Sequence, residues 1–194
     1  ILVAPSGYLK CWNITDEPSD LPDIEFLGEL ITQIKTYPNV DPTKIRIVGT
    51  SNGAGMANRV FVEIDDPGID IICPIVSQLH TGNYRNGNFY YPSNEQNTGA
   101  AFGESKGYDT PKNPATGRRI LAITNSDDGT IPYTGGPKFG SDFLHSQDAA
   151  FAMATSQGYT GSQLSNDAGV ELYSGIVKYS YLNDQVVHIK GSAG

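Results

Sequence analysis

Ser51 is the residue whose neighbours predict chemistry most directly. It stands in Gly49-Thr50-Ser51-Asn52-Gly53, which has the G-x-S-x-G spacing of a nucleophile elbow. In such an elbow the serine occupies a strained strand-to-helix corner, and the glycines let the two chain segments pass closely. The N-terminal amides of the following helix stabilise negative charge on a substrate oxygen. The pentapeptide therefore predicts acyl transfer with a serine nucleophile, the alternative being a plain tight turn.

A serine hydroxyl needs a base within hydrogen-bond reach, and the base in turn needs a carboxylate to orient it. Ligand-facing residues of a parallel sheet follow the carboxyl ends of its strands. His188 comes after the last predicted strand, and Asp127 and Asp128 come after the predicted strand 119–124. The order Ser51, aspartate, His188 is the order found in α/β-hydrolases. We therefore expect His188 to be the base and one of the two aspartates to orient it.

The other two histidines are weaker candidates. His80 begins a long loop and is the second choice of base, whereas His145 is expected to stand at the entry to a helix.

Hydrophobic patterning indicates the elements that must position these groups. Apolar spacings of three and four residues predict a helix within 20–36, and apolar runs predict strands at 1–4, 45–48, 69–76 and 119–124. A helix over 147–156 and a strand over 175–182 follow. Alternation of strands with helices is typical of a parallel sheet flanked by helices. We expect one α/β domain over 1–194.

Residues 80–117 form the longest stretch without a periodic pattern. A loop of this length in a compact domain usually covers a site or is disordered. Its aromatic residues favour a packed lid or a substrate-facing insertion, and they are Tyr84, Phe89, Tyr90, Tyr91, Phe102 and Tyr108.

Composition excludes several classes of partner. The net charge of −8 and the pI near 4.7 make nucleic acid and anionic membrane surfaces poor partners. No apolar run approaches the roughly 20 residues that a membrane span needs. The chain opens within an apolar run and without Met, which we interpret as an excerpt of a longer or processed protein. Cys11 and Cys73 could form one disulfide or remain two thiols, and a buried free thiol is the favoured interpretation for Cys73.

Several blocks of the chain resemble the polyhydroxybutyrate depolymerase-like and feruloyl or acetylxylan esterases of the α/β-hydrolase fold. The block YPNVDPTKIRIVGTSNGAGMANRV, residues 37–60, is similar to the strand-elbow-helix block of that family nearly residue for residue. The resemblance implies a three-layer fold with a mostly parallel central sheet, whose N-terminal strands are apparently missing here. It also implies an enzyme that needs no metal or organic cofactor.

The same resemblance implies roles for particular residues. A family aspartate four residues before a proline matches Asp128 rather than Asp127. The backbone N–H of Asn52 would be one oxyanion-hole donor, and Trp12 and Tyr133 would contact the substrate. The chain lacks the family's His-Gly-rich loop, which supplies a second donor, and it has Ile189-Lys190-Gly191 where the family has Trp-Pro-Gly.

The predicted function is that of a serine carboxylic-ester hydrolase acting on feruloyl, acetyl, short-chain or polymer-linked esters. The resemblance further implies a secreted enzyme. Two alternatives remain open, namely a non-catalytic binding domain derived from a hydrolase and a hydrolase of amides or thioesters. The sequence does not predict an oligomeric state.

Overall fold

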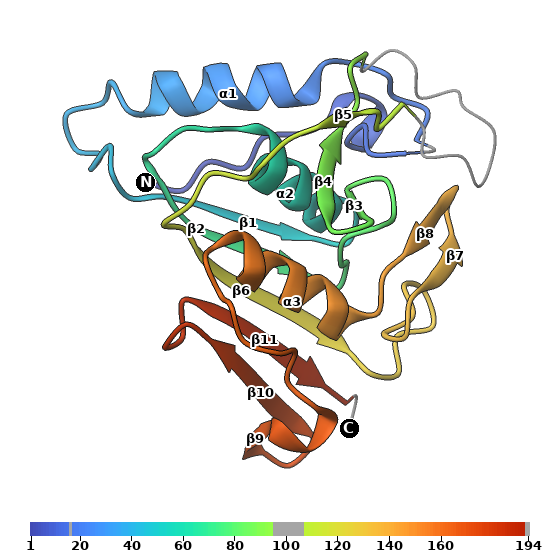
Figure 1. Ribbon diagram of the computed structural model, residues 1–194. Coiled ribbons are helices and arrows are strands. Elements are labelled where there is room, and N and C mark those ends of the chain that lie inside the picture. The colour runs from blue at the N-terminus through green and yellow to red at the C-terminus, as the bar shows by residue number, and fades with distance from the viewer. Residues whose placement is uncertain (16, 95–106, 193–194) are drawn as a thin grey trace.

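A six-stranded sheet organises the computed structural model, which describes residues 1–15, 17–94 and 107–192 (Figure 1). The strand order is β1-β2-β6-β11-β10-β9, and the first four of these strands run parallel to their neighbours. β10 and β9 add on in antiparallel fashion. The strands are β1 (Ile45–Thr50), β2 (Ile69–Ile75), β6 (Arg119–Asn125), β11 (Val186–Gly191), β10 (Ile176–Tyr181) and β9 (Val170–Tyr173). The mixed α/β class and the mostly parallel sheet are as predicted.

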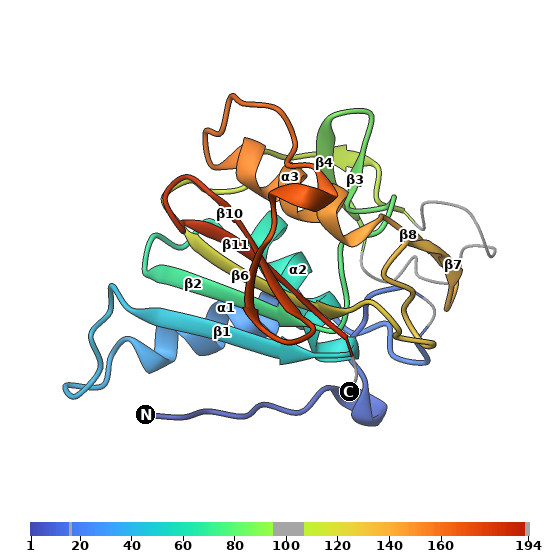
Figure 2. The same ribbon diagram turned by 90° about the horizontal axis from the view of Figure 1, so that it is seen from below.

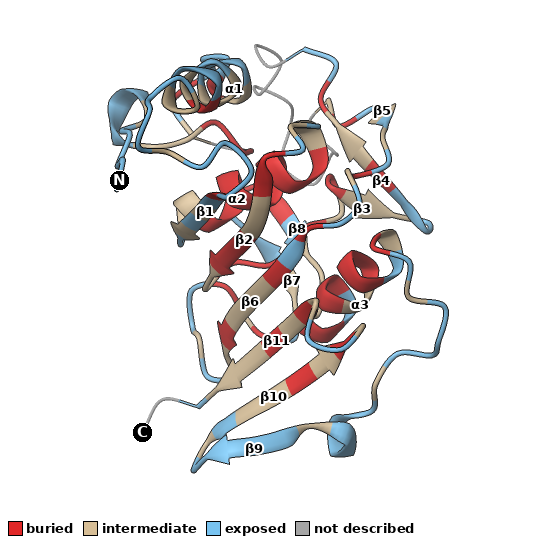
Figure 3. Cartoon of the chain, turned by 90° about the vertical axis from the view of Figure 1, so that its left-hand side faces the viewer, coloured by how far each residue is buried: buried red, intermediate tan, exposed pale blue. Residues whose placement is uncertain are grey.

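Three helices belong to the described residues, α1 (Asp23–Ile34), α2 (Asn52–Glu63) and α3 (Ser146–Ser156). α2 and α3 lie on the same side of the strands, and α1 packs beside α2 (Figure 3). The prediction of α1 is confirmed, but the helix begins at Asp23, and its N-cap is Pro22 rather than Ser19 or Asp20. No helix among the described residues is long and apolar enough to cross a membrane.

Burial differs between the two faces of the sheet. Ile72, Ile120 and Val186, which are neighbours in the strand register, are at most 2 % exposed and face the helices. Val48 points to the other face and is 67 % exposed. In the described part of the chain the helices cover one face of the sheet, so the expectation of three layers stays a prediction.

The N-terminal segment departs from the prediction of a strand at 1–4. Ile1 and Leu2 are 75 % and 94 % exposed and belong to no strand. Figure 2 shows the segment running apart from β1 until it reaches the short 3-10 helix η1 (Tyr8–Lys10). Apolar composition alone does not form a strand, because a strand also needs a hydrogen-bonding neighbour.

The described part of the long loop is packed. It forms a three-stranded sheet of β3 (Tyr84–Arg85), β4 (Asn88–Tyr91) and β5 (Thr110–Pro111). Phe89 packs against Phe61 of α2, and Tyr108 is 1 % exposed. Residues 95–106, which include Phe102, lie outside the described residues, so the role of this loop as a lid stays a prediction.

The C-terminal third adds elements that the sequence did not predict. They are β7 (Gly136–Lys138), β8 (Ser141–Phe143), the 3-10 helix η2 (Asn166–Ala168), the edge strand β9 and the strand β11. Every residue of β9 is exposed (Figure 3). Cys11 and Cys73 are both free thiols, and Cys73 is buried as favoured above.

Candidate active site

Ser51 connects β1 directly to α2. Its backbone has φ 52° and ψ −121°, in the left-handed region that residues other than glycine rarely adopt. Its N–H donates to the carbonyl of Ile75 at 3.0 Å, and its carbonyl accepts from the N–H of Ala54 at 2.8 Å. The side chain is exposed. The predicted strand, sharp turn and helix are therefore present, with the serine at the corner.

The close approach at the corner requires a glycine at position 49. A Cβ atom on Gly49 would lie 2.0 Å from the carbonyl oxygen of Gly53. At position 53 the space is open, because the nearest atom to an added Cβ would be Nε1 of Trp12 at 4.0 Å. The first glycine of the motif is thus a steric requirement of the elbow, and Trp12 lies against its helical side.

Asn52 follows Ser51 as the first residue of α2. Its backbone N–H belongs to the first turn, where amides have no partner within the helix and carry partial positive charge. Its side chain accepts a hydrogen bond from the N–H of Trp12 at 2.7 Å and donates to the Trp12 carbonyl at 3.1 Å. The structure therefore brings three of the predicted site residues together: Ser51, Asn52 and Trp12.

Asp128 lies in the turn after β6, two strands away from β1. Its Oδ1 accepts hydrogen bonds from the N–H groups of Thr130 and Ile131 at 2.7 and 3.0 Å. This carboxylate closes its own turn, as aspartates commonly do. Asp127 is exposed in the same turn.

His188 follows β10, the strand predicted over 175–182, but it lies within a further strand, β11, and not on a loop beyond a strand end, which corrects the sequence-based placement. Its side chain is fully buried, and its register partners are Ala122 of β6 and Tyr179 of β10. Three strand spacings of about 4.8 Å separate β11 from β1, so the two backbones are on the order of 15 Å apart. A proton acceptor must lie about 3 Å from the hydroxyl it serves. The structure therefore does not bring His188 to Ser51.

The hydrogen-bond partner of His188 is Tyr133, the other predicted substrate-binding residue. The Tyr133 hydroxyl lies 3.1 Å from Nε2 of His188, and Tyr133 itself is only 6 % exposed. Burial lowers the pKa of His188 to about 4, against the opposing effect of the Ala122 carbonyl. Burial raises the pKa of Tyr133. A neutral imidazole accepting from a protonated phenol accounts for this pair, which leaves neither group facing Ser51.

The remaining histidines have local partners. Nδ1 of His80 accepts from the N–H of Gly82 at 3.1 Å, and its ring packs edge-on against Tyr108. Nδ1 of His145 accepts from the N–H of Gln147 at 3.1 Å and caps α3, which confirms its prediction as a helix-entry residue. Among the residues that the structure describes, no imidazole is hydrogen-bonded to Ser51.

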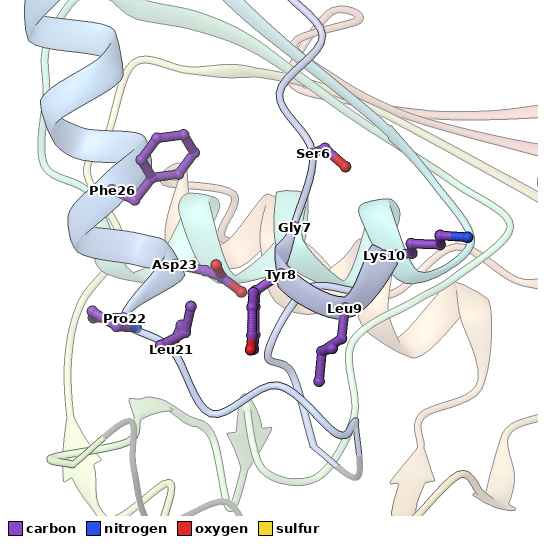
Figure 4. Close-up of a pocket in the computed structure, with 9 residues that line it drawn as sticks. All are labelled: Ser6, Gly7, Tyr8, Leu9, Lys10, Leu21, Pro22, Asp23 and Phe26. Atoms are coloured by element: carbon purple, nitrogen blue, oxygen red, sulfur yellow. The ribbon is translucent and has the colours of Figure 1, made fainter.

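A cavity of about 610 Å³ lies elsewhere, between η1 and the start of α1 (Figure 4). Tyr8 and Leu9 come from η1, and Leu21 and Phe26 come from the other side. Ser51 does not line it.

Sequence reasoning missed the polar groups that hydrogen-bond to the elbow and to the helix that follows it. Oε1 of Glu17 accepts from Nδ2 of Asn52 at 2.9 Å. Arg59 is 1 % exposed, forms a buried ion pair with Glu63 at 2.6 Å, and donates to the Asn13 carbonyl at 2.7 Å. The spacing of Arg59 and Glu63 by four residues on a helix could have indicated their pairing. The contact between Glu17 and Asn52, which are 35 residues apart, has no such signature.

Comparisons of the chain with protein-family models, with curated proteins and with solved structures each found no match.

Proposed function

We propose that this chain is a serine hydrolase of carboxylic esters with Ser51 as its nucleophile. The backbone of Ser51 carries the proposal, because a serine with φ 52° and ψ −121° between a strand and a helix is held in a conformation that costs about 1–3 kcal/mol. Strain of this kind persists where the surroundings impose it, and it is concentrated at functional sites. The exposed Ser51 side chain then stands at the N-terminus of α2.

Two groups of adjacent residues, the Ser51 hydroxyl and the Asn52 backbone N–H, have different roles in the proposed reaction. Oγ of Ser51 attacks the acyl carbonyl, and the negative charge that develops on the carbonyl oxygen is stabilised by the N–H of Asn52. The alcohol leaves with a proton, and water then releases the acyl group from the serine. Trp12, beside Gly53, forms one wall of this site.

His188 does not serve as the general base of Ser51 in this arrangement. We assign to His188 the buried hydrogen bond with Tyr133. A base for Ser51 must stand on a loop at the carboxyl ends of the strands, where Ser51 itself lies. Asp128 occupies such a loop, after β6.

The second candidate is a binding domain without catalysis. The observation that favours it is the absence, among the described residues, of any imidazole hydrogen-bonded to Ser51. This candidate predicts that Ser51 has the ordinary low reactivity of a serine hydroxyl.

A fluorophosphonate probe distinguishes the two candidates, because it modifies activated serines without requiring a chosen substrate. The folded chain is labelled, the modified residue is located by mass spectrometry, and Ser51→Ala is treated in parallel. We expect labelling at Ser51 that is absent in Ser51→Ala and is retained in His188→Gln. Esters with acyl groups of increasing size then identify the substrate. A folded chain that is not labelled would instead support the binding domain.

A further inference from the structure

The side chain of Asn52 joins the elbow to a segment that lies 40 residues earlier in the chain. Its carboxamide makes two hydrogen bonds to the main chain of Trp12, accepting from N–H at 2.7 Å and donating to C=O at 3.1 Å. Ser51 is the next residue, so a movement of Asn52 also moves the nucleophile. The main chain of Trp12 is therefore fixed relative to Ser51 by one side chain.

Glu17 completes this contact. Its Oε1 accepts from Nδ2 of Asn52 at 2.9 Å, and its Oε2 accepts from the N–H groups of Ile14 and Thr15 at 3.0 and 2.5 Å. A carboxylate only accepts hydrogen bonds, so it suits a position where three N–H donors converge. Glu17 thus ties the loop that carries Trp12 to the side chain of Asn52.

Packing holds the same segment on α2. Ile14 lies so close that its Cδ1 would be 2.5 Å from a Cβ atom on Gly55. The carbonyls of Asn13 and Ile14 accept from Arg59 at 2.7 Å and from the Tyr108 hydroxyl at 2.8 Å. Residues 12–15 are consequently held on α2, and Asn52 is their link to the elbow.

We propose that Asn52, through its side chain, and Glu17 are positioning residues that hold the Asn52 backbone amide and the Trp12 ring in place beside Ser51. The inference rests on the proposed function, since the amide matters as a donor to the substrate oxygen. A strained backbone relaxes unless its neighbours prevent it. Here the two hydrogen bonds to Trp12 and the one to Glu17 prevent it.

The sharpest variant is Asn52→Asp. It keeps the size of the side chain and an acceptor for the Trp12 N–H, but it removes the donor to the Trp12 carbonyl and replaces the donor facing Glu17 by a second carboxylate, which repels the first. Glu17→Gln added to Asn52→Asp restores a donor-acceptor pair with reversed roles. The oxygen of the carboxamide introduced at position 17 still accepts from Ile14 and Thr15, while its NH₂ donates to the new carboxylate. Asn39→Asp, at an exposed position, is the matched control for the change in charge.

The experiment measures the saturation kinetics of fluorophosphonate labelling of Ser51 in these chains, with folding checked by urea denaturation. Displacement of catalytic groups by about 1 Å costs on the order of 100-fold in rate. We expect Asn52→Asp to lower the maximal labelling rate by about 10- to 100-fold with little change in probe affinity. The double variant should recover part of this rate, because the donor to the Trp12 carbonyl stays lost, and Asn39→Asp should label like the unchanged chain.

The emission of Trp12 provides a second readout, because Trp12 is the only tryptophan of the chain. Asn52→Asp should shift the emission of Trp12 to longer wavelength and make the indole ring more accessible to acrylamide, and the double variant should reverse both effects in part. If the unchanged chain is labelled and Asn52→Asp is labelled equally fast, the positioning role alone is overturned. Absence of labelling in the folded, unchanged chain would overturn the proposed function and the positioning role together.

Discussion

The hydroxyl of Tyr133 lies 3.1 Å from Nε2 of His188, in the buried layer between the sheet and the loop that follows β6. The predicted roles were those of a catalytic base for His188 and of a substrate contact for Tyr133, yet the two side chains are bonded to each other inside the protein. The pair fixes residues 131–133, and with them the turn of Asp128, to the middle of β11. It therefore contributes to stability whether or not it contributes to catalysis.

Removal of the Tyr133 hydroxyl tests this contribution. Tyr133→Phe leaves Nε2 of His188 buried without its partner, which costs about 1–3 kcal/mol. We expect a loss of this size in the free energy of unfolding, measured by urea denaturation. The control is Tyr173→Phe. Tyr173 is 75 % exposed, so removal of its hydroxyl carries no penalty from a buried polar group that has lost its partner. A loss below about 0.5 kcal/mol in both variants, which is the scatter of ordinary surface substitutions, would contradict the assignment.

The pH dependence of stability gives an independent test of His188. The unfolded chain binds a proton at this residue below the ordinary pKa of about 6.5, whereas the folded chain binds it only near pH 4. Between these values the unfolded state holds more protons, so stability falls as the pH is lowered through this window. The full shift corresponds to about 3–4 kcal/mol at most, since one pKa unit is about 1.4 kcal/mol.

The measurement for this window is the free energy of unfolding at several pH values between about 7 and 4, for the unchanged chain and for His188→Gln. Other titrating groups contribute to both chains, so the difference in slope belongs to His188. Parallel curves would show that His188 does not have a lowered pKa.

The elbow could be predicted from the sequence, whereas the position of His188 could not. The elbow was predictable because its requirements are local: an apolar run, a glycine two residues before the serine, and a helical stretch after it. His188 was misplaced because its polar character indicated a strand end. The alternate spacing of Val186 and His188, which is that of one strand face, agrees with the observed strand. Its burial depends on α3 and Tyr133, which are distant in sequence.

Long-range partners also explain the other failures. Residues 1–4 have strand composition but pair with no strand that the structure describes, and β9 forms beside β10 although every one of its residues is exposed. The contact of Glu17 with Asn52 was hidden for the same reason, since nothing in the residues between them indicates that the two segments meet.

The buried ion pair under the elbow helix yields a third prediction. Arg59→Leu leaves the buried carboxylate of Glu63 without its guanidinium partner, and breaking a buried pair in this way costs about 3–5 kcal/mol. Burial already raises the pKa of Glu63. The carboxyl should therefore take up a proton readily in the variant, so the loss of stability should be smaller at about pH 5 than at about pH 8.

The double variant Arg59→Leu, Glu63→Leu separates the charge from the packing. It removes both charges together, and replacing a whole buried pair by apolar groups is often nearly neutral. We expect it to recover most of the free energy of unfolding lost in Arg59→Leu. No recovery would show that the bond from Arg59 to the Asn13 carbonyl, rather than the ion pair, supports the elbow helix.

The two glycines of the elbow offer the final prediction, with each serving as the control for the other. Gly49→Ala places a Cβ atom 2.0 Å from the Gly53 carbonyl oxygen, so the backbone of β1 or α2 must shift. We expect a loss of more than about 3 kcal/mol, in the range reserved for steric conflicts in the core. Gly53→Ala meets only Nε1 of Trp12 at 4.0 Å and lies in the first turn of α2. Alanine favours helix over glycine by up to about 1 kcal/mol, so this variant should be as stable as the unchanged chain or more so. Urea denaturation of the two variants measures the contrast, and equal stabilities would contradict the tight corner on which the assignment of Ser51 depends.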